Sequence, residues 1–128
     1  LAVVALAATA FSVAWLLLRR RSLASVRRAA GSLPGYEPGK ATVVLITSPS
    51  CGVCKAAQRP ALAEAARRHP GEVRVLEVDA VECAELARRW SVLTVPTTFV
   101  LDRTGTPRSV NHGFAPLRTI EEQLALVL

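Results

Sequence analysis

The stretch Ser48-Pro49-Ser50-Cys51-Gly52-Val53-Cys54-Lys55 decides how this chain folds. It follows the apolar run Ala-Thr-Val-Val-Leu-Ile at 41–46, which predicts a buried strand. It leads into a helical pattern that continues to Arg68, and Ser50 predicts a cap at the start of that helix. A Cys-x-x-Cys pair therefore stands where a strand hands over to a helix.

That position gives the two cysteines a definite chemistry. Backbone N–H groups at a helix start have no partner within the helix and carry partial positive charge. A thiolate there is stabilised, so we expect the pKa of Cys51 to lie below the value of about 8.5 of a free cysteine. A spacing of three residues puts both sulfur atoms on one side of the first turn, so Cys51 and Cys54 can close into a disulfide. Beside a strand–helix–strand pattern, Cys-x-x-Cys indicates a redox site.

Two other interpretations of the pair remain open. Cys-x-x-Cys is also half of many zinc sites, and the remaining candidate ligands are Cys83, His69 and His112. A buried, inert pair is the other alternative. The sequence contains no second Cys-x-x-Cys and no His-x-x-x-His, and the strand-to-helix position favours the redox interpretation. We predict that Cys83 is a small buried hydrophobe, with a redox-sensing or intermolecular role as the alternative.

Composition and charge bound the remaining possibilities. The chain has 128 residues, is 51% hydrophobic, and carries a net charge of +6. Five arginines at 19–21, 27 and 28 supply most of that charge, and the sequence after them is nearly neutral, which argues against a nucleic-acid partner. Three cysteines are too few for a secreted disulfide scaffold.

The N-terminal stretch predicts a membrane anchor. Residues 1–18 are apolar apart from Thr9 and Ser12, and Trp15 lies where an interfacial aromatic is expected. We predict a single transmembrane helix at 1–20, with a cleaved signal peptide as the first alternative and a soluble core helix as the second. The arginines that follow favour a domain on the cytoplasmic side, with the extracytoplasmic side as the alternative. Residues 21–40 predict a basic juxtamembrane segment and a Gly/Pro-rich linker.

The pattern from 41 to 128 predicts one α/β domain. Strands are expected at 41–47, 72–78, 97–101 and 107–111, and helices at 51–68, 81–90 and 116–128. Pro60 should bend the first of these helices, because a proline inside a helix removes one backbone hydrogen bond. The order β-α-β-α-β-β-α predicts a mixed four-stranded sheet flanked by helices, with a parallel pair followed by an antiparallel hairpin.

This region, residues 41–128, resembles the thioredoxin superfamily. Three features carry the resemblance: Cys51-Gly52-Val53-Cys54 at the strand–helix junction, Val95-Pro96-Thr97 before a strand, and Gly113 after the hairpin. The resemblance implies that Cys51 attacks a substrate disulfide, that Cys54 resolves the mixed disulfide, and that the Val95–Pro96 bond is cis. It also implies that the substrate lies against Gly52, Val53, Val95, Pro96 and Gly113.

Several positions depart from the thioredoxin pattern. Val53 stands where thioredoxin has proline, and Ser50 where it has tryptophan. Leu45 replaces a buried aspartate that assists proton transfer from the resolving cysteine, and Val75 replaces a nearby lysine. The helix proline, Pro60, is displaced by one position. These differences leave the reduction potential open.

The sequence therefore predicts a membrane-anchored thiol–disulfide oxidoreductase that reduces protein disulfides. Its expected partners are disulfide-containing proteins, an upstream reductase that donates electrons, and the membrane; no cofactor and no metal are expected. One alternative is an extracytoplasmic protein for cytochrome c maturation or similar thiol maintenance. Another is a non-enzymatic, membrane-tethered module that senses redox state or binds zinc.

Overall fold

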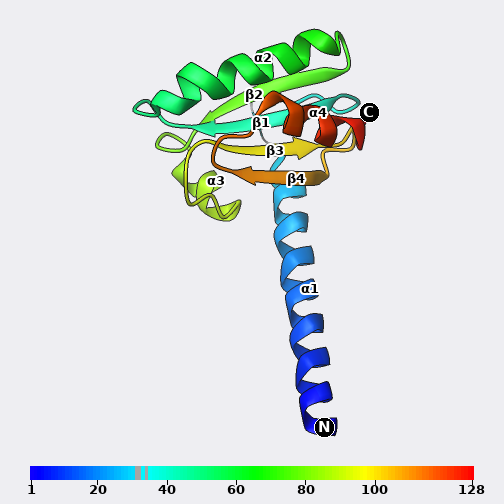
Figure 1. Cartoon of the computed structure of the whole chain (residues 1–128). Coiled ribbons are helices and arrows are strands. Elements are labelled where there is room, and N and C mark those ends of the chain that lie inside the picture. Colours follow the sequence, from blue (N-terminus) through cyan, green and yellow to red (C-terminus); the bar gives the residue numbers. More distant parts are fainter. Residues whose placement is uncertain (31–32, 34) are drawn as a thin grey trace.

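The computed structural model describes residues 1–30, 33 and 35–128, and the side chains of residues 19 and 22–30 lie outside the described part. Figure 1 shows a helix-flanked sheet with one long N-terminal helix. The elements are, in chain order, α1 (Ala2–Ala30), β1 (Ala41–Thr47), the π-helix η1 (Cys54–Gln58), α2 (Arg59–Arg68), β2 (Val73–Asp79), α3 (Ala84–Arg89), β3 (Thr97–Leu101), β4 (Pro107–His112) and α4 (Leu117–Ala125).

The four strands form one mixed sheet in the order β2-β1-β3-β4. Strand β1 pairs in parallel with β2 and antiparallel with β3, and β3 pairs antiparallel with β4. All seven residues of β1 are buried, because strands cover both of its edges and helices cover its faces. The predicted mixed four-stranded sheet is confirmed.

The alternation of side chains along β1 divides the core into two layers. Val44 and Ile46 pack on one face of the sheet with Trp90 and Phe99. Val43 and Leu45 pack on the opposite face, which α2 and α4 cover (Figure 1), with the side chains of Leu62, Ala65, Ile120 and Leu124. Successive strand residues point to opposite faces, so one strand supplies both layers.

The segment before β1 contributes to the core. Leu33 is only 5% exposed and packs in the layer of Trp90 and Phe99, with Tyr36 against the same cluster. Its sequence, rich in glycine and proline, indicated only a linker. Leu33 therefore packs against the sheet, and the region before β1 contributes to the hydrophobic core.

The prediction of a transmembrane helix at 1–20 is wrong. Helix α1 projects away from the sheet (Figure 1). Among the residues that the structure describes, no helix combines the length and the apolar character needed to cross a membrane. The side chains of Arg19, Arg27 and Arg28, on which the predicted orientation depended, lie outside the described residues.

The turn between β3 and β4 is organised by Asp102. Its carboxylate accepts hydrogen bonds from the backbone N–H groups of Thr104 and Thr106, the Thr104 hydroxyl and Nε of Arg108, at 2.6 to 3.0 Å. Burial by itself would raise the pKa of Asp102, but these hydrogen bonds outweigh it and lower the pKa below the ordinary value of 3.8. The ionised carboxylate therefore stabilises the hairpin.

We expect Asp102→Asn to lower the free energy of unfolding by about 1–2 kcal/mol at neutral pH, because the amide accepts fewer of these hydrogen bonds. The carboxylate has a lowered pKa in the folded state, so its stabilisation is present above the unfolded pKa of about 3.9 and is lost as the pH falls through the folded pKa. Urea unfolding at several pH values measures this.

The matched control is Glu122→Gln, because Glu122 forms a hydrogen bond with Arg118 at the exposed surface of α4. This change should alter stability by less than about 0.5 kcal/mol. An equal effect of the two substitutions, or an Asp102→Asn effect that persists at acid pH, would contradict the role given to Asp102.

Candidate active site

Cys51 and Cys54 form a disulfide. Cys51 lies at the end of the loop that follows β1, and Cys54 lies in the first turn of the helix after it. Their Cα atoms are 5.3 Å apart. Cys51 is partly exposed, whereas Cys54 is fully buried. The backbone N–H of Cys54 donates to Sγ of Cys51 at 3.2 Å, so the sulfur itself takes the capping role predicted for Ser50. The more accessible sulfur is thus also the one that the helix start stabilises.

The helix that carries Cys54 opens with a π-turn. Residues Cys54–Gln58 form the π-helix η1, in which the N–H of Arg59 donates to the carbonyl of Cys54, five residues back. Pro60 then lies in the first turn of α2, where its missing N–H costs no internal hydrogen bond. The structure shows a change of helix type directly before Pro60, where a bend was predicted.

Gln58 is the buried polar side chain of this turn. It is 0% exposed and four residues after Cys54, on the face that points into the protein. The backbone N–H of Ala115 donates to Oε1 of Gln58 at 2.8 Å, and Nε2 of Gln58 donates to the carbonyl of Ala115 at 3.0 Å. The side chain therefore joins the helix that carries Cys54 (η1 with α2, here called the redox helix) to the segment between β4 and α4.

That segment is also joined to the proline loop. The Val95–Pro96 bond is cis, as predicted. The backbone N–H of Gly113 donates to the carbonyl of Pro96 at 2.8 Å, and Gly113 has a φ of +87°, a conformation that favours glycine. The hydrogen bonds of Gly113 with Pro96 and of Ala115 with Gln58 thus connect the proline loop, through the Gly113–Ala115 segment, to the helix that carries Cys54.

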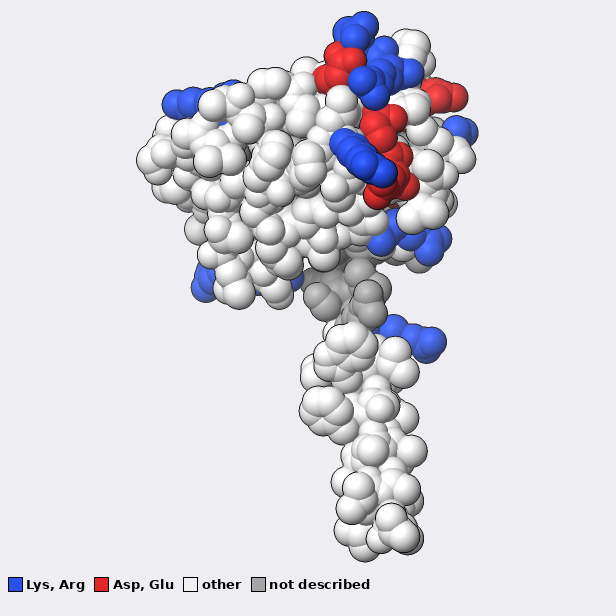
Figure 2. All heavy atoms as spheres, in the orientation of Figure 1, with Lys and Arg blue, Asp and Glu red and all other residues white. Residues whose placement is uncertain are grey.

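Large apolar side chains are exposed on these segments. The exposed fractions are 50% for Val53, 48% for Phe114 and 93% for Leu93, in the motif, after Gly113 and before Val95 respectively. Figure 2 shows that acidic and basic side chains gather over the far end of α2 and over α4, and that basic side chains also lie at the upper left, where α2 begins. Exposed apolar side chains on the segments that carry the cysteine pair and the cis-proline provide contacts for an apolar polypeptide segment.

Leu45, at the position of the thioredoxin aspartate, has an apolar and buried side chain. Leu45 is fully buried on the α2 side of the sheet, with Leu62 in the same layer. A surface pocket of about 300 Å³ is lined by Leu45 together with residues of α2 and β2, with the Arg59–Glu77 ion pair among its walls. Leu45 therefore provides no proton-accepting group beneath the helix that carries Cys54.

Cys83, the third cysteine, differs from expectation. Cys83 is a free and exposed thiol, so the prediction that it is buried is wrong. It directly precedes α3, and that helix starts late because Asp79 Oδ1 accepts hydrogen bonds from the N–H groups of Val81 and Glu82 in a turn. The turn leaves the Cys83 side chain outside the core.

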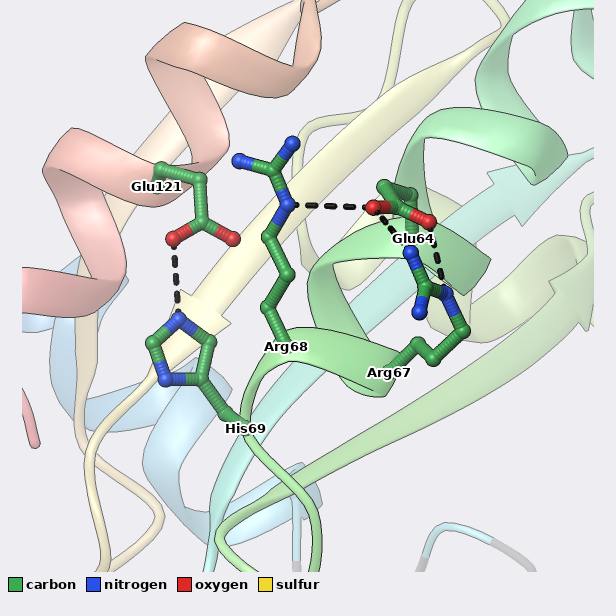
Figure 3. Close-up of polar contacts among 5 residues, drawn as sticks. All are labelled: Glu64, Arg67, Arg68, His69 and Glu121. Atoms are coloured by element: carbon green, nitrogen blue, oxygen red, sulfur yellow. Dashed lines mark hydrogen bonds and ion pairs between the residues drawn. The ribbon is translucent and has the colours of Figure 1, made fainter.

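His69 belongs to a polar cluster at the opposite end of α2 from Cys54. Figure 3 shows its ring turned toward Glu121 of α4, with the Nε2–Oε2 distance at 2.8 Å. Glu64 accepts hydrogen bonds from Arg67 and Arg68, which lower the pKa of its carboxyl, Arg67 having the larger effect. His69 therefore links two helices.

His112 is the last residue of β4. Within the described part of the chain, no three His, Cys, Asp or Glu side chains gather as a metal ion would require.

A Cys-x-x-Cys disulfide at a strand–helix junction, linked through the β4–α4 connection to a cis-proline loop, defines a thioredoxin-like α/β protein. The sequence model of the thioredoxin family matches residues 36–125. The chain belongs to the thioredoxin family.

Solved structures agree on the fold. Thioredoxin-2, described as a component of the malaria parasite protein secretion machinery, is 19% identical, with a TM-score of 0.64 over 71% of this chain and 86% of the other. A thioredoxin-like protein from Clostridium perfringens is 22% identical, with a TM-score of 0.64 over 71% and 73%. A thiol:disulfide interchange protein from Chlorobium tepidum is 16% identical, with a TM-score of 0.57 over 70% and 80%. No curated protein matches the sequence significantly.

Sequence reasoning missed Gln58 and Ala115. The available signal was the spacing of Gln58, which places a polar side chain on the same helix face as Cys54. The backbone of Ala115 has no sequence signal, because any residue supplies one N–H and one carbonyl there.

Proposed function

We propose that this protein is a thiol–disulfide oxidoreductase that reduces protein disulfides with Cys51 and Cys54. The observation that carries the proposal is the asymmetry of the pair: Cys51 is accessible and accepts a hydrogen bond at the helix start, whereas Cys54 is fully buried one turn on. A buried sulfur cannot meet a protein substrate first, so its role is to attack the mixed disulfide.

The reaction starts from the reduced pair. The thiolate of Cys51 attacks one sulfur of the substrate disulfide, so that a Cys51–substrate bond forms and one substrate thiolate leaves. The thiolate of Cys54 then attacks Sγ of Cys51, the second substrate thiolate leaves, and the Cys51–Cys54 disulfide forms. Two electrons pass to the substrate, and the two thiol protons are taken up by the departing thiolates. An external dithiol restores the reduced pair, and no other cofactor takes part.

The substrate would lie against the apolar surface of Val53, Leu93 and Phe114. The cis Val95–Pro96 segment and Gly113 would lie beside this surface. The hydrogen bond from Gly113 to the carbonyl of Pro96 holds these two segments together. An extended segment could there pair with the Val95 backbone while its cysteine reaches Cys51. The absence of a carboxylate at Leu45 leaves solvent or the substrate thiolate to take the proton of Cys54.

Reduction of insulin by dithiothreitol tests the proposal. We expect catalytic amounts of the protein to accelerate precipitation of the insulin B chain by at least about tenfold over dithiothreitol alone, because the site supplies a stabilised thiolate and a resolving thiol. The boiled protein and a Cys51→Ser variant are the controls. Precipitation at the rate of dithiothreitol alone would refute the proposed function.

A further inference from the structure

Gln58 is an unusual side chain for the interior of this domain. It is among the largest fully buried side chains. Burying an amide is unfavourable unless its donor and acceptor are both satisfied. Here both ends are satisfied by the N–H and the carbonyl of the single residue Ala115. Such a two-point contact fixes the position of a backbone segment as well as its distance.

The segment fixed in this way carries the exposed Phe114. On its other side, Gly113 is bound to the carbonyl of Pro96. Phe114 thus stands between two anchor points, one on the proline loop and one on the redox helix. The amide pair of Asn111 and Gln123, with hydrogen bonds of 2.7 and 2.8 Å, holds β4 to α4 independently of Gln58.

Loss of the Gln58 amide would release one anchor point. The N–H and carbonyl of Ala115 are buried and would have to find other partners. The backbone between Gly113 and Ala115 would then shift, and with it the position of Phe114 relative to Cys51. The covalent geometry of the cysteine pair would be unaffected.

We propose that Gln58 is a positioning residue that holds the Gly113–Ala115 segment beside the redox helix, and that this contact is required for rapid reaction with protein disulfides. The inference rests on the proposed function, in which a protein substrate lies against Phe114 and Gly113. A small disulfide needs only access to Sγ of Cys51, so it should react independently of Gln58.

The test compares two substrates in single-turnover reactions of the reduced protein. The probes are insulin, as a protein disulfide, and hydroxyethyl disulfide, as a small one. We expect Gln58→Met, which keeps the length and removes both hydrogen bonds, to slow the reaction with insulin about tenfold, as loss of a buried hydrogen bond allows. The rate with hydroxyethyl disulfide should stay within about twofold. The matched control, Gln123→Met, removes a similar amide pair and should leave the ratio of the two rates unchanged.

Each outcome decides between the possibilities. A selective loss with insulin supports the positioning role. Equal losses with both substrates would indicate a general structural role and overturn it, as would no loss with either. A wild-type protein that reduces neither substrate refutes the proposed function, and the inference with it. Hydrogen exchange reports on the contact without activity: the Ala115 amide should exchange faster in Gln58→Met, and unchanged exchange would overturn the inference.

A second variant covers the case in which Gln58→Met does not fold. In Gln58→Glu, a protonated carboxyl can accept from the Ala115 N–H and donate to its carbonyl, whereas an ionised carboxylate can only accept. As the pH is lowered from about 8 to about 5, the ratio of the rate with insulin to the rate with hydroxyethyl disulfide should therefore rise toward the wild-type value. A ratio that does not change with pH would overturn the proposal.

Discussion

Cys51→Ser should reduce insulin no faster than dithiothreitol alone. The serine hydroxyl stays protonated at neutral pH and cannot form a disulfide, so neither the mixed disulfide nor the Cys51–Cys54 bond can arise. The rate of insulin precipitation measures this loss, which removes the whole catalytic acceleration. Circular dichroism of the variant, with an unchanged spectrum expected, shows that the fold is retained.

Cys54→Ala should stop the reaction one step later. Cys51 still attacks the substrate, but no second thiol releases it, so a covalent protein–substrate adduct accumulates. Non-reducing electrophoresis and mass spectrometry detect this adduct, and dithiothreitol should dissolve it. Adducts that form through Cys54 in the Cys51→Ser variant, at the same rate, would reverse the assignment of the two roles.

The matched control for both variants is Cys83→Ser. Cys83 is exposed and free, and it takes no part in the Cys51–Cys54 disulfide. Its replacement should leave the insulin reduction rate within about twofold of wild type, because surface substitutions away from a site have small effects. A large loss in Cys83→Ser would mean that the third thiol takes part in the exchange.

Trp90→Ala should strongly lower the stability of the domain. Trp90 is 3% exposed and contacts Phe99 edge to face, with ring centroids 4.8 Å apart. Removing the indole leaves a cavity in the layer that also contains Leu33 and Ile46. We expect the free energy of unfolding to fall by about 3–5 kcal/mol, a large part of the roughly 5–15 kcal/mol typical of a domain. Urea unfolding followed by circular dichroism measures it.

The control for Trp90→Ala is Leu93→Ala, another large-to-small change close by in the sequence. Leu93 is 93% exposed, so its truncation creates no cavity and should change stability by less than about 0.5 kcal/mol. If Trp90→Ala also stayed within about 1 kcal/mol of wild type, the layer around Phe99 would not be the core that its burial indicates.

The strands were predictable because their hydrophobic pattern and their turn residues agree. The predicted bounds 41–47 and 97–101 match β1 and β3, and the apolar face predicted for the last helix, with Ile120 and Leu124, is the buried one. The cysteine pair and the cis-proline could be named from short motifs. In each case local sequence and tertiary packing favour the same structure.

The remaining features depend on contacts that local sequence does not encode. Leu33 lies among helix-breaking residues, and only its burial against Trp90 reveals its role. Cys83 was expected inside because cysteine is commonly buried, but the Asp79 turn places it outside. The apolar N-terminal run suggested a span, but none of the helices in the described part of the chain has the length and apolar character that a span requires.

The π-turn has a consequence for the number of residues that the chain can hold between Cys54 and α2. A π-turn accommodates one more residue than the α-helical turn it replaces, so α2 keeps its buried face while Pro60 stands one position later than in the thioredoxin pattern. Deletion of Ala57 should therefore return this turn to α-helical length while Arg59 and the residues after it keep their places in α2, because the π-turn is what absorbs the additional residue. Gln58 belongs to the turn that would be remade, so the deletion would alter the buried contact with Ala115 while it leaves the rest of α2 in place.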